Sequence, residues 1–486
     1  MIATNARAGF ALLGAGPTGL GAAWRLTQSF PASGNHAQSP DASVPFLLLD
    51  QASAPGGRAS SVTTAEGFTF DYGGHVLFLH PEYDELLELL NQAVPEWHSS
   101  TPVRGVWLNH QLIPTPVQRN IHRLPFPTMA ACLWGLWRRN SNAADSNGAN
   151  SNGLNHAEPS LQRYLEAQFG KALTRHVMAP LNRKMWAHPP ETLGSAWSSH
   201  RSGSKEKNIP DVSVQAVLRN WWLHRDEPGW TPATRVRYPL RGGTGSMWKN
   251  IFAAIPEPYR LLNAKVQGVE AQAKRLHLCD GSTVAYEKLI TSIPIDIFLG
   301  LLVDQPDLQA KAREFHAARV QIFGLGLEGP MPEQLKGVHA FSVPSPEIPF
   351  WRVNIPSNFS PGNVPDPENT WSILCEKSIA PDSTVRSDSA RVEAALRGMG
   401  LIPPQTKVVS NFSAELAHGY PVPFAGRDQL LNQVQAQLEQ LDIFSRGRFG
   451  GWRYEVSNQD HSFMQGVEVI DRLLTGKPEY TYQKTW

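Results

Sequence analysis

The chain has 486 residues, 41% of them hydrophobic, so it is long enough to bury more than one core and to form two or three domains. Its 44 Lys and Arg residues nearly cancel its 43 Asp and Glu residues, which argues against nucleic acid or an anionic membrane as a partner. No apolar run approaches the roughly 20 residues of a membrane span, and the first residues do not resemble a secretion signal, which predicts a cytoplasmic protein.

The N-terminal region predicts a dinucleotide-binding unit. An apolar strand at residues 10–13 runs into the sequence GAGPTG at 14–19, which opens a helix, and a second apolar strand at 45–49 ends in Asp50. The glycines would let the backbone and the helix N-terminus approach a pyrophosphate, and the carboxylate would accept from a ribose hydroxyl. A polar stretch at 29–43 separates helix and strand, and we expect it to be a surface insertion.

Further glycine clusters favour FAD over NAD. The sequence PGGRAS at 55–60 follows Asp50 directly, and GGH at 73–75 adds a third place where backbone can approach a ligand. In flavoproteins of the glutathione-reductase type, the second cluster lies near the flavin end of the pyrophosphate. GLGLEG at 324–329 also fits the dinucleotide pattern, but Pro330 stands where a helix would begin. We therefore expect a strand there and no second unit for NAD(P)H.

The remaining elements alternate between helical and strand patterns. A Trp-rich helical segment at 129–137 is separated from a second helical region at 161–185 by a polar stretch, 140–159, which is predicted to be disordered. Apolar alternation predicts strands at residues 261–272, 274–292, 319–329 and 370–378. Nearer the C-terminus, an apolar period of 3.6 residues predicts helices at 429–441 and 467–474.

The chemistry-bearing residues indicate an anionic, sugar-like ligand rather than a metal or a hydrolytic nucleophile. The 16 histidines include no HExxH motif and no Cys/His cluster, and no GxSxG elbow occurs, so no metal site is expected. Arg, Trp, Tyr and Asn gather instead in three segments, at 182–201, 349–361 and 445–463. Arginine offers a rigid fork of donors, which suits diphosphate.

These blocks, with DYGGHVLF, RYPLRGGTGSMW and SRGRFGGWRYEVSNQDHSFMQGVE, resemble the UDP-galactopyranose mutases of the longer eukaryotic type along most of the chain. The resemblance implies an α/β fold: a Rossmann-like FAD-binding domain of the glutathione-reductase type, an inserted helical domain, and an antiparallel β-sheet domain for the substrate. The implied bounds are 1–95, 236–305 and 405–486 for the FAD-binding domain, 120–235 for the helical domain, and 96–119 with 306–404 for the sheet domain.

The resemblance also implies a redox-neutral isomerisation between UDP-galactopyranose and UDP-galactofuranose. The N5 atom of reduced FAD attacks the anomeric carbon, UDP leaves, and a covalent flavin N5–sugar adduct forms before the ring recloses through another hydroxyl. The implied partners are a nucleotide sugar and a reductant for the flavin, NAD(P)H or another donor. The oligomeric state stays open.

The family's functional positions map onto this chain residue by residue. Its catalytic positions correspond to Arg201 and Arg352, on the leaving diphosphate, and to His75, against the flavin. Its substrate-binding positions correspond to Tyr420, Tyr454, Asn220, Trp186, Asn182, Gln118 and Phe359. The cofactor-binding positions fall in the glycine clusters and the C-terminal block, at Gly14, Gly16, Pro17, Thr18, Gly19, Asp50, Gly57, Arg58, Ala59, Ser60, Gly74, His75, Gly243, Val266, Arg448, Gly451, Ser457, Asn458, Gln459 and Ser462.

The chain departs from the family mainly around the nucleotide base. Thr115 replaces a tyrosine that contacts uracil, Phe359 replaces a diphosphate tyrosine, Trp107 replaces an arginine near the flavin, and Ala340 and Ser342 replace a Trp/Tyr pair. Three alternatives therefore stay open: a mutase for another nucleotide sugar, an FAD-dependent oxidoreductase of the amine-oxidase or protoporphyrinogen-oxidase type, and an FAD-containing binding protein without turnover.

Overall fold

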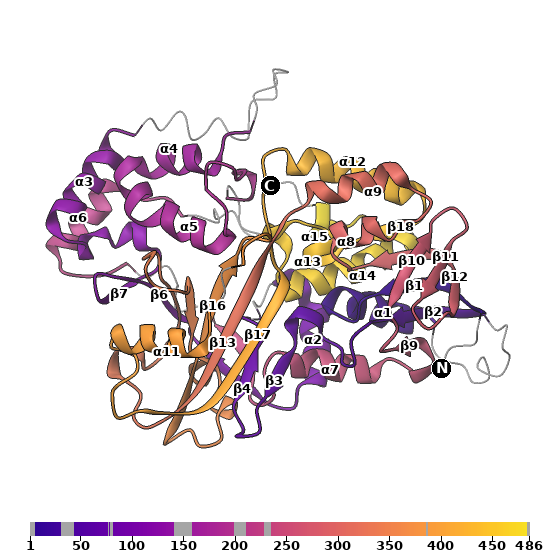
Figure 1. Ribbon diagram of the computed structural model, residues 1–486, viewed down its shortest axis with the longest axis horizontal. Coiled ribbons are helices and arrows are strands. Elements are labelled where there is room, and N and C mark those ends of the chain that lie inside the picture. Colours follow the sequence, from indigo (N-terminus) through magenta and orange to yellow (C-terminus); the bar gives the residue numbers. More distant parts are fainter. Residues whose placement is uncertain are drawn as a thin grey trace.

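The computed structural model describes residues 5–30, 43–75, 77, 81–139, 158–198, 210–227, 235–384 and 387–483. Most of the expected surface insertion at 29–43 and of the polar stretch at 140–159 lies outside the described residues. Figure 1 shows three parts: helices α3 to α6 on one side, a long-stranded sheet in the middle, and an α/β part that contains both ends of the chain on the other side.

The α/β part is built on a mostly parallel sheet. Strands β12, β1, β2 and β9 run parallel in that order, β18 pairs with the C-terminal end of β12, and the hairpin β10–β11 continues the sheet antiparallel. Both faces are covered, as the continuous apolar sequences of β1 and β2 require. The bounds are β1 Asn5–Leu13, β2 Ser43–Leu49, β9 Arg260–Leu261, β10 Val266–Glu270, β11 Arg275–Leu278, β12 Thr283–Thr291 and β18 Ile443–Ser445.

Helices cover this sheet on its two faces and make two separate apolar cores. Side chains of α1, α2, α7 and α14 form one core, and those of α8, α9, α12 and the α13 turn form the other. The Rossmann-like α/β fold predicted from the sequence is thereby confirmed. The bounds are α1 Pro17–Ser29, α2 Asp84–Ala93, α7 Gly245–Ala254, α8 Ile295–Gly300, α9 Pro306–Lys311, α12 Arg427–Gln440, α13 Gly447–Gly450 and α14 Gln459–Thr475.

Helices α1 and α14 touch backbone to backbone. A Cβ on Gly466 would lie 1.9 Å from the carbonyl oxygen of Thr18, and one on Gly21 would lie 2.1 Å from that of Phe463, so only glycine fits at either position. Helix α14 begins at Gln459, eight residues before the expected start at 467, because its first turns bury polar side chains that hide the apolar period.

The second large sheet has the strand order β17-β13-β16-β15-β14-β6-β7, and every pair except the parallel β14–β6 is antiparallel. Strand β17 pairs along the whole of β13. The sheet therefore continues to Pro421, beyond residue 405, where the sequence places a domain boundary. The bounds are β6 Val103–Leu108, β7 Gln111–Pro114, β13 Ala317–Glu328, β14 Val338–Ser342, β15 Arg352–Asn354, β16 Thr370–Ile379 and β17 Lys407–Pro421.

The GLGLEG segment lies in strand β13, as expected. A Cβ on Gly324 would lie 2.7 Å from the ring of Phe70, and one on Gly326 would lie 2.7 Å from the ring of Phe68. The glycines thus make room for two phenylalanine rings, Phe70 within β4 and Phe68 directly before it. The remaining short elements are β3 Ser61–Thr63, β4 Thr69–Asp71, β5 Trp97–Ser100, β8 Val236–Pro239, α10 Pro356–Phe359 and α11 Ser389–Gly398.

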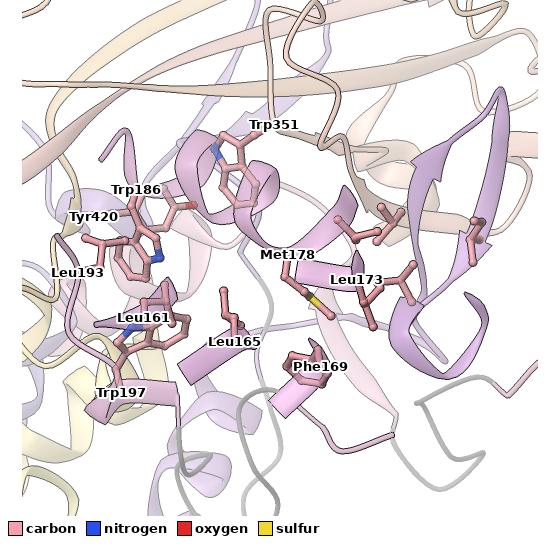
Figure 2. Close-up of a cluster of buried hydrophobic side chains, with 14 of the residues drawn as sticks. Leu161, Leu165, Phe169, Leu173, Met178, Trp186, Leu193, Trp197, Trp351 and Tyr420 are labelled. Carbon is pink, nitrogen blue, oxygen red and sulfur yellow. The ribbon is translucent and has the colours of Figure 1, made fainter. Parts of the chain in front are cut away.

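The helical part shares its core with the second sheet. Figure 2 shows Leu161, Phe169 and Trp186 from the helices in one cluster with Tyr420 of β17 and with Trp351, which directly precedes β15. Helices α4 and α5 are joined by a π-helical turn, so the helix expected at 161–185 is one interrupted helical path. No helix in the described ranges is long and apolar enough to cross a membrane. The bounds are α3 Phe126–Trp137, α4 Leu161–Leu173, α5 Ala179–Trp186 and α6 Val214–Trp222.

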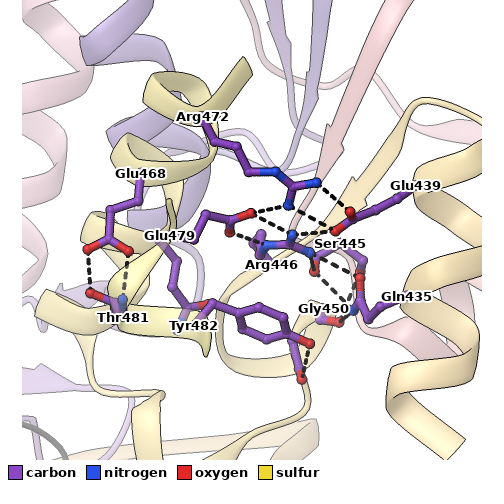
Figure 3. A network of polar contacts seen from close by, with 12 residues as sticks. Gln435, Glu439, Ser445, Arg446, Gly450, Glu468, Arg472, Glu479, Thr481 and Tyr482 are labelled. Atoms are coloured by element: carbon purple, nitrogen blue, oxygen red, sulfur yellow. Dashed lines mark hydrogen bonds and ion pairs between the residues drawn. The ribbon is translucent and has the colours of Figure 1, made fainter. Parts of the chain in front are cut away.

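A buried ion-pair network anchors the C-terminal segment, which ends in α15 (Tyr480–Gln483), beneath the α13 turn (Figure 3). Arg446, 1% exposed, binds Glu479 at 2.5 Å and Glu439 at 2.7 Å, and Arg472 binds the same two carboxylates. Burial of a guanidinium is tolerated only with such paired charges. The network therefore fixes the turn that begins at Gly447, next to the α1 N-terminus.

Candidate active site

The GAGPTG loop connects the C-terminal end of β1 to the N-terminus of α1. Gly14 has a φ of 103° and donates its N–H to the carbonyl of Leu49 at 2.8 Å. A Cβ on Gly19 would lie 1.8 Å from the carbonyl oxygen of Gly14, so helix and loop meet without side chains. Pro17 occupies the first turn of the helix, with Gly16 as its N-cap. This geometry exposes backbone N–H groups to an anion.

Asp50 lies at the end of β2 and faces this loop. Its carboxylate accepts the N–H of Ala15 at 2.6 Å and of Ala52 at 2.8 Å, while burial raises its pKa. Its carbonyl accepts the N–H of Ala264 at 2.8 Å, which brings the start of β10, with Val266, to the same edge. Asp50 and Val266, which the sequence predicts to contact the ribose and the adenine, therefore lie at the same edge of the sheet.

The second glycine cluster packs against the first. Gly56 donates to the carbonyl of Ala15 at 2.8 Å, and a Cβ on Gly57 would lie 3.4 Å from Gly16 Cα. Both Gly56 and Gly57 have positive φ values, 106° and 52°. Ala59 is buried behind them, and the Ser60 hydroxyl donates to Pro55.

Two arginines approach each other beside these glycines without a carboxylate partner. Arg58 and Arg448 both lie over the ring of Phe449, at 5.8 and 5.5 Å. Burial, and then the charge of Arg448, lower the pKa of Arg58 to about 10. Within the described part of the chain neither guanidinium forms an ion pair; Arg448 donates to the Ser457 hydroxyl at 2.8 Å. Such paired cations fit a bound anion.

The C-terminal block presents a buried donor without a protein acceptor. Gln459 accepts the indole N–H of Trp248 at 3.1 Å, but its own Nε2 has no partner among the residues that the structure describes. Ser462, in the first turn of α14, donates its N–H to the carbonyl of Asn458, and Gly451 leaves no room for a Cβ beside Gly447. Glycine cradles, unpaired arginines and an unsatisfied amide together fit FAD.

The loop at residue 243 closes on a buried carboxylate. A Cβ on Gly243, whose φ is 65°, would lie 2.4 Å from Ser61 Oγ and 2.5 Å from Asp71 Oδ1. Asp71 accepts the hydroxyl of Tyr238 at 2.8 Å, and burial raises its pKa. Burial lowers the pKa of nearby His75, against the charge of Asp71, so this imidazole is neutral at pH 7.

Glu376, which the sequence did not single out, links the GGH loop to the substrate side. Its carboxylate accepts the N–H of Gly74 at 2.8 Å, the amide of Asn354 at 2.9 Å and the hydroxyl of Tyr420 at 3.1 Å. Arg352 lies 3.8 Å away and donates to the Gly74 carbonyl at 3.3 Å. Burial acts to lower the pKa of Arg352, but Glu376, Tyr420 and Tyr454 together outweigh burial, so the pKa is raised.

An aromatic wall stands beside Arg352. Trp186 meets Tyr454 at 4.9 Å and Tyr420 at 6.0 Å, edge to face, and Asn182 orients Trp186 by accepting its indole N–H at 3.2 Å. Arg448 lies over Tyr420 at 5.3 Å and over Tyr454 at 5.6 Å. Residues expected to bind the cofactor and residues expected to bind the substrate thus lie together beside Arg352.

Other expected substrate residues lie apart from this group. Gln118 is buried and donates to the carbonyl of Pro210 at 2.8 Å, and Asn220 donates to Glu227 at 3.2 Å. Phe359 packs instead on Tyr238 and His339, with ring centroids 5.7 and 5.0 Å apart. Arg201 lies outside the described residues.

The substituted family positions have distinct surroundings. Trp107 is buried against Phe341, with ring centroids 6.1 Å apart, so it supplies no charge to the site. Burial raises the pKa of Tyr454, and three arginines act to lower it: Arg448, then Arg352, and least of the three Arg104, on the same strand as Trp107. Arg104 therefore supplies a cation near the wall that the sequence interpretation missed.

What the arrangement offers is anion binding and positioning. In the described ranges no group of His, Cys, Asp or Glu side chains is placed to hold a metal ion. Arg58 and Arg448 lie beside the glycine loops, while the carboxylate of Glu376 already accepts hydrogen bonds from Gly74, Asn354 and Tyr420.

Comparisons with known proteins agree with this geometry. The profile of NAD(P)-binding Rossmann-like domains matches residues 13–93. A crystal structure of a reduced UDP-galactopyranose mutase is 32% identical, with a TM-score of 0.86 over 98% of this chain and 96% of that one. A putative protoporphyrinogen oxidase from Exiguobacterium sp. 255-15 (14% identity, TM-score 0.67, 96% of this chain and 98% of that one) and a putrescine oxidase bound to putrescine (16%, 0.61, 97% and 99%) share the fold.

Proposed function

Because the chain belongs to the UDP-galactopyranose mutase family, we propose that it is an FAD-dependent nucleotide-sugar mutase that interconverts UDP-galactopyranose and UDP-galactofuranose. One observation carries the proposal: the Arg352 guanidinium lies between the Gly74 carbonyl and the wall formed by Tyr420, Tyr454 and Trp186. A diphosphate on this arginine would bring the attached sugar to the loop that faces the flavin.

The protein's own contribution is to bind and neutralise the leaving diphosphate. Reduced FAD, when bound, would supply the nucleophile for the anomeric carbon, and an NAD(P)H-type or other donor would keep it reduced. Arg352 offers a fork of donors to the phosphate oxygens, and the hydroxyls of Tyr420 and Tyr454 add hydrogen bonds. Arg201, outside the described residues, is proposed as the second diphosphate arginine.

Positioning and exclusion of water complete the proposed role of these residues. Glu376 holds the Gly74 N–H and the Tyr420 hydroxyl in one frame, so the flavin-facing loop and the diphosphate site keep a fixed distance. The Trp186 ring, fully buried, closes the wall against water. His75, kept neutral by burial, adds no charge that would repel a cationic sugar in the transition state.

The base pocket is the part of the substrate that this chain treats differently from the family. Thr115 stands where a tyrosine contacts uracil, and Gln118 is already bonded to the Pro210 carbonyl. We propose uridine as the base, held by the diphosphate group more than by base contacts. Titration of the reduced flavin spectrum with UDP, GDP and TDP tests this choice; a response to GDP or TDP alone would contradict it.

The function is tested with dithionite-reduced protein and UDP-galactofuranose, with products separated by HPLC. Wild type is expected to form UDP-galactopyranose. Arg352→Ala should lower kcat/KM by about 100- to 1000-fold, as for loss of a donor to developing negative charge, and Arg352→Lys, which keeps charge without the fork, should fall between. Sustained oxygen uptake with an amine or polycyclic substrate would indicate an oxidoreductase instead. Nucleotide-sugar binding without any turnover would indicate a binding protein.

A further inference from the structure

Lys184 makes a contact that the proposed mechanism does not use. From helix α5 its side chain reaches the segment 343–350, which connects β14 to β15, and its Nζ lies near four backbone carbonyl oxygens. The distances are 2.8 Å to Val343, 2.8 Å to Ser345, 3.1 Å to Ile348 and 2.6 Å to Phe350. An ammonium has three N–H groups, so one of them is shared between two acceptors.

The composition of this segment explains why its carbonyls need an external donor. Three of its eight residues are proline, which has no N–H, and only two of its N–H groups are bonded within the segment or to Trp351. Unpaired carbonyls that are removed from water destabilise the fold. Among the described residues no carboxylate lies within ion-pair distance of Lys184, so its direct partners are the carbonyl oxygens. Burial lowers the pKa of this ammonium to about 7, while the charge of Glu347 acts in the opposite direction.

The two ends of this contact lead directly to the candidate active site. Helix α5 carries Asn182 and Trp186, two residues away from Lys184 in either direction. The segment leads into Trp351 and then Arg352, and the N–H of Val343 donates to the Trp351 carbonyl at 2.7 Å. Lys184 thus joins the helix that holds one side of the aromatic wall to the strand that holds the diphosphate arginine.

Tyr420 lies between the two tryptophans that this contact positions. Its ring centroid is 6.0 Å from that of Trp186 and 5.8 Å from that of Trp351, and all three residues appear in Figure 2. A shift of the segment relative to α5 would change the contacts of Tyr420 with Trp186 and Trp351 at once. Because the Arg352 guanidinium lies 5.8 Å from the Trp351 ring, the same shift would change the direction of Arg352.

We propose that Lys184 is a positioning residue for the mutase reaction, whose ammonium fixes the Arg352 strand to helix α5 through the carbonyl cage of residues 343–350. The proposal rests on the proposed function for the role of Arg352, but the cage itself does not. Because the four acceptors are oxygens arranged around one cation, truncation of the side chain should leave a site for a small primary ammonium ion.

The test compares FAD-loaded wild type, Lys184→Ala and Lys184→Met, with Arg183→Ala as the matched control. Arg183 is exposed on the same helix, and among the residues that the structure describes it pairs only with Glu191, at 3.4 Å. Each protein is reduced, and kcat and KM are measured with and without propylammonium chloride, which replaces the missing side chain, and with tetramethylammonium chloride, which has no N–H donors. Near-UV circular dichroism of the tryptophans is recorded in the same solutions.

Lys184→Ala should lose on the order of 100-fold in kcat/KM, the effect of a small misplacement of a positioned group, together with part of the near-UV signal. Propylammonium should restore both, tetramethylammonium should restore neither, and Arg183→Ala should behave as wild type.

Equal restoration by the two salts, or by neither, would overturn the proposal. So would wild-type kinetics and a wild-type near-UV signal in Lys184→Met, which keeps the volume of the stem and guards against a variant that fails to fold. If wild type converts no nucleotide sugar, the proposed function fails, whereas the near-UV signal and its dependence on propylammonium still decide whether the cage exists.

Discussion

Glu376→Gln is the substitution that examines the link between the flavin-facing loop and the diphosphate site most closely. Glutamine keeps the length of the side chain, and its oxygen can still accept from Gly74 and Asn354, while its amide faces the hydroxyl of Tyr420. What disappears is the charge. A hydrogen bond to a charged group contributes about 1.5–3 kcal/mol and a neutral one about 1 kcal/mol, so three bonds lose about 1.5–6 kcal/mol together.

Part of this loss should appear in catalysis, because Arg352 loses its only carboxylate neighbour in the described residues. If about 2 kcal/mol acts on the transition state, kcat/KM falls about 30-fold. Urea unfolding and steady-state kinetics of the reduced enzyme measure the two effects, with exposed Glu368→Gln as the control, expected within about 0.5 kcal/mol of wild type. Wild-type kcat/KM and stability in Glu376→Gln would refute the reasoning.

Three further substitutions test other parts of the structure. Burial lowers the pKa of His339 to about 4, below the unfolded value of about 6.5, so the folded state binds fewer protons than the unfolded chain. The free energy of unfolding should therefore fall by about 2 kcal/mol between pH 7 and pH 5, and His339→Gln should remove this loss in urea titrations. Gly243→Ala should lower the FAD-to-protein ratio of the purified protein, whereas Gly300→Ala, where a Cβ meets nothing within 4 Å, should not. Glu479→Ala should lower the free energy of unfolding by about 3–5 kcal/mol, because it leaves buried Arg446 without its main partner; a loss below 1 kcal/mol would show that the ion pair is not buried as described.

The fold was predictable where neighbouring residues in the sequence show which backbone conformation is required. The glycines at 14–19 and 56–57 mark positive φ values and close approaches that no other residue permits, and a strand before them and a helix after them give the context. GLGLEG was separated from this pattern by the proline that follows it. Its strand assignment is confirmed, because the segment lies in β13 and pairs there with β16.

The site was predictable only in part, because its central contacts join residues far apart in the chain. Glu376 binds groups 22, 44 and 302 residues away, and the only local signal was a single acidic residue within an apolar strand. Lys184 and its carbonyl cage are about 160 residues apart. The pairing of β17 with β13 has the same character, since it depends on tertiary contacts rather than on the composition of either strand.

The measurement that tests the central claim most directly is the oxidation state of the flavin during turnover. Reduced enzyme is mixed anaerobically with UDP-galactofuranose, and the flavin spectrum and the products are followed together. An isomerase converts many equivalents of sugar nucleotide per flavin while the flavin remains reduced, and the oxidised enzyme converts none. Product limited to one equivalent, with the flavin reoxidised in step, would contradict the proposal.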